Sequence, residues 1–301
     1  MYKRQVKIKA DTINNLIADT IIFDGNINLL KDSLKTIINK LIHEKKQRNS
    51  SEKEPSKELK ELQNYALGLK GEVDVLFRGV RFNLFIADLD SNDISLHLMD
   101  PLTKKNYFSI NALLQSQILK DKETLMITNA GMYMPNFQPE GLYIENYKLI
   151  TPIDTASPNI VANFYLMPNG VFLIDSLGFP SILETKSYVK KFGLSNSAQI
   201  KYATQSGPLL VINDSIHPKF IRGSQNLKIR SGVGIINDKK IIFIITLDEV
   251  NFYDFATFFN KVFLCKDALF LDGAISKMYL PTINPNEKGG KFGALISTTK
   301  K

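Results

Sequence analysis

Three short polar segments decide the fold of this chain: Thr128-Asn129-Ala130-Gly131, Thr204-Gln205-Ser206-Gly207-Pro208 and Asp272-Gly273-Ala274-Ile275-Ser276. Each follows an apolar run that is typical of a buried strand, and each combines glycine with amide, hydroxyl or carboxylate groups. Glycine allows a sharp turn and a close approach of a ligand to the backbone. Polar side chains at strand ends lie at the rim of a rigid sheet. Three such rims predict one shared pocket, with the arginine motif Lys228-Ile229-Arg230-Ser231-Gly232 as a further wall.

The composition is that of a folded protein with a large core. The chain has 301 residues, of which 44% are hydrophobic, with 19 Phe and 11 Tyr, and this excludes global disorder. The net charge is +8 and the pI is near 9.2. Because the lysines are scattered and no RNA-binding signature is present, the basic charge indicates a lysine-rich globular protein without a nucleic-acid partner.

The single cysteine, Cys265, excludes an intrachain disulfide and a thiolate metal site. It lies in the apolar run Val262–Cys265, which predicts a packed thiol rather than a nucleophile. No apolar segment approaches the roughly 18 residues of a transmembrane helix. The stretch Met1–Lys9 carries charges without an apolar run, so the sequence as written predicts no signal peptide.

Two patterns resemble metal sites, and neither has a full set of ligands. The three histidines are far apart in the chain, which argues against a histidine-rich site. The aspartates of the segment Asp88–Asp93 lack the Gly and Glu of a calcium loop and predict a turn. No glycine-rich nucleotide-binding loop is present. No cofactor is therefore predicted, although a divalent cation at Asp272 is left open.

Residues 1–72 and 73–301 differ in pattern. In the first part, apolar residues recur at steps of three and four between Ile27 and Ile42 and again between Leu59 and Leu69, as in amphipathic helices. The sequence therefore predicts an N-terminal helical extension over residues 1–72. Either this extension has no chemistry of its own, or its helices contact the main domain or a protein partner.

Residues 73–301 predict an α+β domain with a mixed, mostly antiparallel sheet core and packed helices. Alternating apolar and polar residues indicate half-buried antiparallel strands, and Pro168-Asn169-Gly170 predicts a hairpin turn between two of them. The predicted strands are Val73–Phe77, Val80–Ile86, Ile94–Leu98, Asn163–Met167, Val171–Asp175, Leu209–Ile212, Ser231–Ile236 and Ile241–Thr246, and the predicted helices are Ile110–Leu119 and Phe252–Leu264.

Taken together, these residues resemble the phosphodiester glycosidase family from about Arg81 to Ser297. The family usually has an Asn-Gly-Gly or Asn-Ala-Gly turn followed by an apolar or aromatic residue, as in Asn129–Tyr133 here. No single motif is specific, and the resemblance depends on the number, order and spacing of the motifs. The further matching segments are Pro139–Leu142, Gln205–Pro208, Asn226–Gly234, Val250–Ala256, Ala268–Gly273 and Gly289–Gly293.

The chain is most similar to the short bacterial branch of this family. Asp272-Gly273-Ala274 stands where the long animal enzymes have Asp-Gly-Gly, and this departure leaves the identity of the substrate open. The family implies an exported or periplasmic protein of the cell envelope, whereas the chain as written shows no leader.

The resemblance implies hydrolysis of a sugar-1-phosphodiester, such as one of N-acetylglucosamine, to free sugar and a phosphomonoester. Ordinary glycosidases need a second carboxylic acid to protonate the leaving oxygen, but phosphate is already a good leaving group. One carboxylate with cationic stabilisation of the departing phosphate would suffice. Asp272 is then the candidate nucleophile or general base. Arg230 is the candidate phosphate clamp, because its planar guanidinium can donate to two phosphate oxygens.

Asn129 completes the candidate catalytic set through its side-chain amide. Each of these residues also has an interpretation without chemistry: Asp272 as a cap of the following turn, Arg230 in an ion pair, and Asn129 as a turn asparagine. The predicted substrate-binding residues supply amide, hydroxyl, ammonium or backbone N–H groups, and they are Gly131, Gln205, Ser206, Gly207, Lys228, Gly273 and Ser276.

Two other functions fit the same residues. One is a non-catalytic protein that binds a glycan or envelope polymer in the same pocket. The other is a phosphodiesterase that breaks the P–O bond of the same linkage instead of the C–O bond. All three functions have a sugar phosphodiester or glycan as the partner, without nucleic acid.

Overall fold

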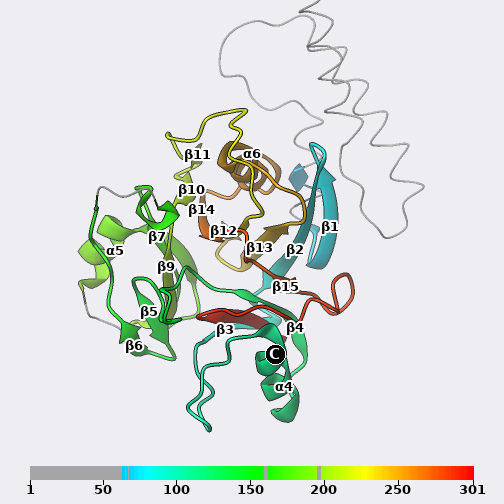
Figure 1. The fold of residues 1–301 in the computed structure, drawn as a ribbon, viewed down its shortest axis with the longest axis vertical. Helices are drawn as coiled ribbons and strands as arrows, with labels where there is room; N and C mark the ends of the chain where they lie inside the picture. The colour runs from blue at the N-terminus through cyan, green and yellow to red at the C-terminus, as the bar shows by residue number, and fades with distance from the viewer. Residues whose placement is uncertain (1–62, 65, 67, 159–161, 195–197) are drawn as a thin grey trace, which may run out of the picture.

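The computed structural model describes residues 63, 64, 66, 68–158, 162–194 and 198–301 (Figure 1). The predicted N-terminal helical extension, residues 1–72, lies almost entirely outside the described residues, and so does the predicted contact of its helices with a partner. Within the described ranges, no helix is both long and apolar enough to cross a membrane.

Three antiparallel sheets form the described part of the molecule, and this confirms a mostly antiparallel α+β fold. The seven-stranded sheet has the order β1 (Gly71–Phe77), β2 (Val80–Asp88), β13 (Lys240–Thr246), β12 (Ser231–Asn237), β14 (Asp267–Asp272), β10 (Leu209–Ile212) and β11 (Ser215–Ile216). The four-stranded sheet has the order β15 (Met278–Tyr279), β4 (Thr124–Asn129), β16 (Leu295–Lys300) and β3 (Asn92–His97). The five-stranded sheet has the order β6 (Lys148–Thr151), β5 (Tyr143–Glu145), β9 (Ile200–Ser206), β7 (Gly170–Asp175) and β8 (Pro180–Glu184).

The three sheets share one core, and each sheet carries a helix on its other face. In the shared core, Phe243 and Leu269 of the seven-stranded sheet belong to the same cluster as Met126 and Phe172 of the other two sheets. The helices that cover the other faces are α6 (Phe252–Thr257) on the seven-stranded sheet, α5 (Thr185–Phe192) on the five-stranded sheet and α4 (Ile110–Leu119) on the four-stranded sheet (Figure 1).

Strand β2 is buried on both faces. Phe82 and Leu84 belong to the cluster under α6, whereas Phe85 and Ala87 belong to the shared core. A strand that is covered on both sides carries a nearly continuous apolar run, and the sequence prediction of a half-buried strand at this position is therefore wrong.

The predicted helices are found, one of them in shortened form. α4 spans the predicted residues, and its first turn is capped by Ser109, whose Oγ accepts from the Ala112 N–H. The predicted helix Phe252–Leu264 is α-helical only to Thr257, after which it continues as the π-helical segment η3 (Phe258–Val262).

The predicted strand Asn163–Met167 is wrong. The chain forms a single 3₁₀ turn there, η2 (Asn163–Tyr165), and β7 pairs with β8 and β9 instead. The cause is local, because the side-chain amide of Asn169 donates to the Phe164 carbonyl at 3.1 Å and folds the chain back before β7 begins. The segment Pro168-Asn169-Gly170 therefore leads into β7 rather than joining two strands.

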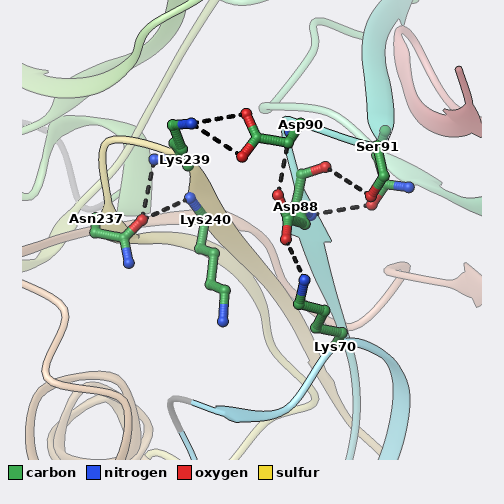
Figure 2. Close-up of polar contacts among 8 residues, drawn as sticks. Lys70, Asp88, Asp90, Ser91, Asn237, Lys239 and Lys240 are labelled. Carbon is green, nitrogen blue, oxygen red and sulfur yellow. Dashed lines mark hydrogen bonds and ion pairs between the residues drawn. The ribbon is translucent and has the colours of Figure 1, made fainter.

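The turn after β2 gathers aspartates, as predicted, and two lysines neutralise them (Figure 2). Asp88 accepts from Lys70 Nζ at 2.6 Å and from the Asp90 N–H at 3.1 Å, and both carboxylate oxygens of Asp90 accept from Lys239 Nζ at 2.9 Å. The bond from Lys70 lowers the pKa of Asp88 below its ordinary value. The turn carries the chain out of the seven-stranded sheet and into the four-stranded one, so the consecutive strands β2 and β3 do not pair.

Candidate functional site

Strand ends from two sheets meet at the start of β12. Ser231 is the first residue of β12 and pairs in register with Asp272, the last residue of β14. Ser231 Oγ lies 2.8 Å from Ser276 Oγ, and Asn129 Nδ2 lies 3.4 Å from Ser231 Oγ and 3.5 Å from Ser276 Oγ. The structure thus brings Asn129, Asp272 and Ser276 together, and Ser231 is the residue that links them.

Asn129 is the last residue of β4 and is only 1% exposed. Its Oδ1 accepts from the Lys277 N–H at 3.2 Å, while its Nδ2 faces the two serine hydroxyls. The amide therefore ties the end of the four-stranded sheet to the turn that follows β14.

Burial raises the pKa of Asp272 to about 6, although the Gly273 N–H donates to Oδ1 at 2.7 Å and acts in the opposite direction. Among the described residues, no cation forms an ion pair with this carboxylate. A carboxyl group at a strand end that titrates near neutral pH is suited to exchange a proton with a ligand.

Arg230 immediately precedes β12 and is only 1% exposed. Its guanidinium carbon lies 3.6 Å from the centroid of the Phe252 ring, Nε donates to the Val250 carbonyl at 2.8 Å, and Nη2 donates to the Asn226 carbonyl at 2.9 Å. Burial lowers the pKa of Arg230 to about 10. In the described part of the chain no carboxylate pairs with it, so the guanidinium is a buried cation held by neutral groups.

Arg230 and Asp272 lie at the same end of the paired strands β12 and β14, because Ser231, which follows Arg230 in the chain, pairs with Asp272. Their side chains form no ion pair, and neither charge is a cause of the other's pKa shift. The positive and the negative group are therefore both left without a charged partner inside the described protein.

The polar side chains at the end of β9 form hydrogen bonds inside the protein. Gln205 Oε1 accepts from the Leu142 and Asp154 N–H groups at 2.9 Å each, and its Nε2 donates to the Asp154 carbonyl at 2.7 Å and to Thr185 Oγ1 at 3.1 Å. Ser206 Oγ donates to a carbonyl of β14 at 2.9 Å. Both side chains are therefore occupied by protein groups and hold neighbouring segments together.

The predicted glycines differ in the space around them. A Cβ added at Gly131 would lie 2.4 Å from a backbone oxygen, and one added at Gly207 would lie 2.7 Å from another, so both positions require glycine. At Gly273 nothing lies nearer than 3.8 Å. The predicted ligand Lys228 is exposed, unlike the buried Arg230.

Sequence reasoning missed a second acidic group near Asp272. The pKa of the half-buried Glu140 is raised by burial and by the charges of Asp154 and Asp272. Tyr165 donates its hydroxyl to Asp154 Oδ2 at 2.8 Å, and this bond raises the pKa of Tyr165 to about 12. Glu140 stands in the segment Pro139–Leu142, and its place in that motif was the one feature of the sequence that could have revealed it.

Two adjoining pockets open on this part of the molecule. The larger, of about 580 Å³, is lined by residues of the 219–226 loop and the start of α6, including Asn226 and Phe252, which hold Arg230. The smaller, of about 480 Å³, includes the first residues of α5 and shares Met167 with the larger one. Asp272 lines neither pocket.

Other groups of chemical interest are engaged or buried. Cys265 is buried, as predicted for a packed thiol, and burial raises its pKa. His97 Nε2 lies 2.8 Å from Ser297 Oγ in the four-stranded sheet. Over the described ranges, no group of three or more His, Cys, Asp and Glu side chains is arranged to hold a metal ion.

The fold and the site define an antiparallel α+β protein with a half-buried carboxyl group and a buried guanidinium at the ends of adjacent strands. The chain belongs to the phosphodiester glycosidase family, whose model matches residues 122–295. β1, β2 and β3 precede the matched region but complete its sheets, because β2 pairs with β13 and β3 pairs with β16.

The relatives include bacterial proteins. The Escherichia coli protein YigE is 34% identical over 202 residues, which cover 64% of this chain and 72% of YigE. The catalytic domain of zebrafish N-acetylglucosamine-1-phosphodiester alpha-N-acetylglucosaminidase, auto-inhibited by its pro-peptide, matches 76% of this chain and 78% of its own, with 14% identity and a TM-score of 0.49. A hypothetical protein from Synechocystis matches 77% of this chain and 62% of its own, with 10% identity and a TM-score of 0.46.

Proposed function

We propose that this protein hydrolyses a sugar-1-phosphodiester on the sugar side of the linkage and releases the free sugar and a phosphomonoester. Family membership supports the class of reaction. The observation that carries the proposal is the Asp272 carboxyl group, which is half-buried at a strand end with a pKa of about 6 and has no cationic partner among the described residues.

The chemistry needs only one carboxylate in the first step. Water adds to the anomeric carbon, the bond from that carbon to the phosphate oxygen breaks, and the phosphomonoester leaves with the electron pair. Asp272 either takes the proton of the attacking water or first forms a glycosyl intermediate that water then opens. With a pKa of about 6, the group is mostly ionised at neutral pH and still basic enough for either role.

The other predicted residues are assigned to two places around the bound substrate. Arg230 stabilises the departing phosphate, and Asn129 orients the sugar through the hydroxyl network of Ser231 and Ser276. In this proposal, the remaining predicted binding residues also serve the substrate: Gly131, Lys228 and Gly273 border it, and Gln205, Ser206 and Gly207 support the segments around it.

The substitution Asp272→Asn tests the proposal. On an aryl-phosphoryl N-acetylglucosamine we expect turnover to fall by about 10²–10⁴-fold, because the variant can neither accept a proton nor attack. Asp267→Asn is the matched control, since Asp267 lies at the other end of the same strand and its pKa is also raised by burial. The control should keep the rate of the unsubstituted protein. A normal rate for a natively folded Asp272→Asn protein would rule out the assigned role.

Isotope labelling separates the related functions. In ¹⁸O-labelled water, cleavage of the C–O bond places the label on the anomeric hydroxyl of the sugar. Label in the phosphate would instead indicate a phosphodiesterase, and binding of the sugar phosphodiester without any turnover would indicate a glycan-binding protein.

A further inference from the structure

We infer that the larger pocket is an oxyanion site that holds the phosphate group of the substrate. We call it the Lys219 pocket, and the lining residues that matter are Tyr165, Lys219, Phe220, Ser224, Asn226 and Phe252. The inference rests on the proposed function for the identity of the anion as a phosphodiester. The affinity of the pocket for a simple oxyanion does not depend on that function.

The first observation is the buried cation behind the pocket wall. Arg230 donates from Nε and Nη2 to backbone carbonyls, and one of these carbonyls belongs to Asn226, a residue of the pocket lining. Arg230 is 1% exposed and is not itself part of the lining. Its positive charge therefore acts on the pocket from behind the wall, through the groups that hold it, and not by direct contact with an anion.

The second observation is a column of stacked rings that ends on Arg230. The rings of Phe220 and Phe252 stack at 4.9 Å with an interplanar angle of 8°, and those of His217 and Phe220 stack at 4.6 Å and 21°. Because the guanidinium occupies one face of Phe252 at 3.6 Å, Phe220 must occupy the other. The faces of both phenylalanine rings are thus covered, and Phe270 packs against Phe252 at 4.9 Å and 80°, so the half-buried Phe220 is the ring that offers its edge to the pocket. Aromatic edges carry the positive end of the ring quadrupole, which attracts oxyanions.

The third observation is the charge of the lining. Lys219 is exposed at the pocket, and none of the described side chains that line it is acidic. Asp154 contacts the Tyr165 hydroxyl but does not line the pocket. Ser224 and Asn226 add polar side chains on the same loop. An ammonium and polar side chains at the surface, with a guanidinium behind the wall, make a pocket suited to a tetrahedral oxyanion.

His217 connects the column to the lysine. It is 1% exposed, and its Nδ1 accepts from the Lys219 N–H at 3.2 Å, so the ring proton lies on Nε2. Nε2 is buried without a hydrogen-bond partner in the described protein. His217 therefore positions both Phe220, by stacking, and Lys219, by its backbone, and it does not touch the anion itself.

Binding of inorganic phosphate to the full chain tests the inference without any turnover. Calorimetric titration in a phosphate-free buffer at constant ionic strength should show binding that Lys219→Gln weakens about fivefold or more, because one ammonium is lost from the lining. Lys261→Gln is the control, since Lys261 is an exposed lysine that is not part of the lining. Phe220→Leu, which removes the middle ring, should weaken phosphate binding as well.

The outcomes separate this inference from the proposed function. No phosphate binding, or equal binding by the Lys219 and Lys261 variants, would overturn the oxyanion site. If hydrolysis occurs, Lys219→Gln should raise KM with little change in kcat, and an unchanged KM would also overturn it. Phosphate binding that depends on Lys219, in a protein that hydrolyses no sugar phosphodiester, would overturn the proposed function alone.

Discussion

Strand β14 leaves the core at Asp272. Four buried apolar residues precede Asp272, whose side chain can carry a charge. The polar segment after an apolar run was enough to predict a residue at the rim of a sheet. The burial that raises its pKa could not be predicted, because it depends on tertiary packing. In the folded protein the charge of Asp272 reaches Tyr133 and Glu140, which are far from it in the chain, and contributes to raising their pKa values.

The raised pKa of Asp272 has a measurable effect on stability. Between about pH 4, where the unfolded chain loses this proton, and pH 6, where the folded protein loses it, the folded state binds more protons. The contribution of Asp272 to the free energy of unfolding therefore falls as the pH rises through that window, and it is constant above pH 6. We expect Asp272→Asn to be more stable than the unsubstituted protein at pH 7 by about 2–3 kcal/mol.

Urea unfolding at intervals from pH 4 to pH 8 checks this expectation. The difference in unfolding free energy between the two proteins should grow up to pH 6 and then level off. Parallel curves over the whole range would show that Asp272 keeps an ordinary pKa in the folded protein.

The sequence motif predicts the role of Arg230 but not the groups that surround its side chain. Its position and residue type predict a cation near a phosphate, and the structure places it at the start of β12. Its support comes from Phe252 and the Val250 carbonyl, which lie in another segment, and from the Phe220 ring beyond. No spacing in the sequence indicates that stack, because each pair of rings meets only through the folding of the 217–226 loop onto α6.

At the level of elements, sequence patterns located strands well where the backbone hydrogen bonds follow a regular ladder. They failed at Asn163–Met167, where one asparagine side chain replaces the ladder with a turn. They also failed to assign strands to sheets, since β2 and β3 follow each other in the chain but belong to different sheets. Pairing between distant strands is decided by packing, which local patterns do not contain.

The junction between β4 and β9 provides a test at this scale. Gly131 donates its N–H to Thr204 Oγ1 at 3.3 Å, and a Cβ there would lie 2.4 Å from the Gln205 carbonyl oxygen. Gly131→Ala must push the two segments apart, and we expect a loss of about 2–3 kcal/mol. Gly273→Ala, with nothing within 3.8 Å of the new methyl group, should change stability by no more than about 0.5 kcal/mol.

Chemical denaturation of the two alanine variants measures the contrast. Equal stabilities would mean that the β4 and β9 segments are not held as closely as the structure shows.

At the scale of the whole molecule, the inner and edge strands of the seven-stranded sheet differ in burial. Its inner strands β12 and β13 have the shared core on one face and the α6 cluster on the other, and Phe243 and Ile244 of β13 are 0% exposed. The two-residue strand β11 lies at the edge of the same sheet.

Native-state hydrogen exchange should reflect this difference. Amides of β13 should exchange only through global unfolding, with the free energy found by denaturant, whereas those of β11 should exchange through local opening. Exchange of the β13 amides as fast as those of β11 would contradict the burial of this sheet on both faces.

The position of β16 has a consequence for how the molecule is assembled during synthesis. β3 and β4 never pair with each other, and both pair with β16, so contacts such as that of His97 with Ser297 join positions 200 residues apart. Until residues 295–300 leave the ribosome, two strands that need a common neighbour stay open to other chains. Because Leu295 pairs with Asn129, the sheet end that carries this amide also closes late.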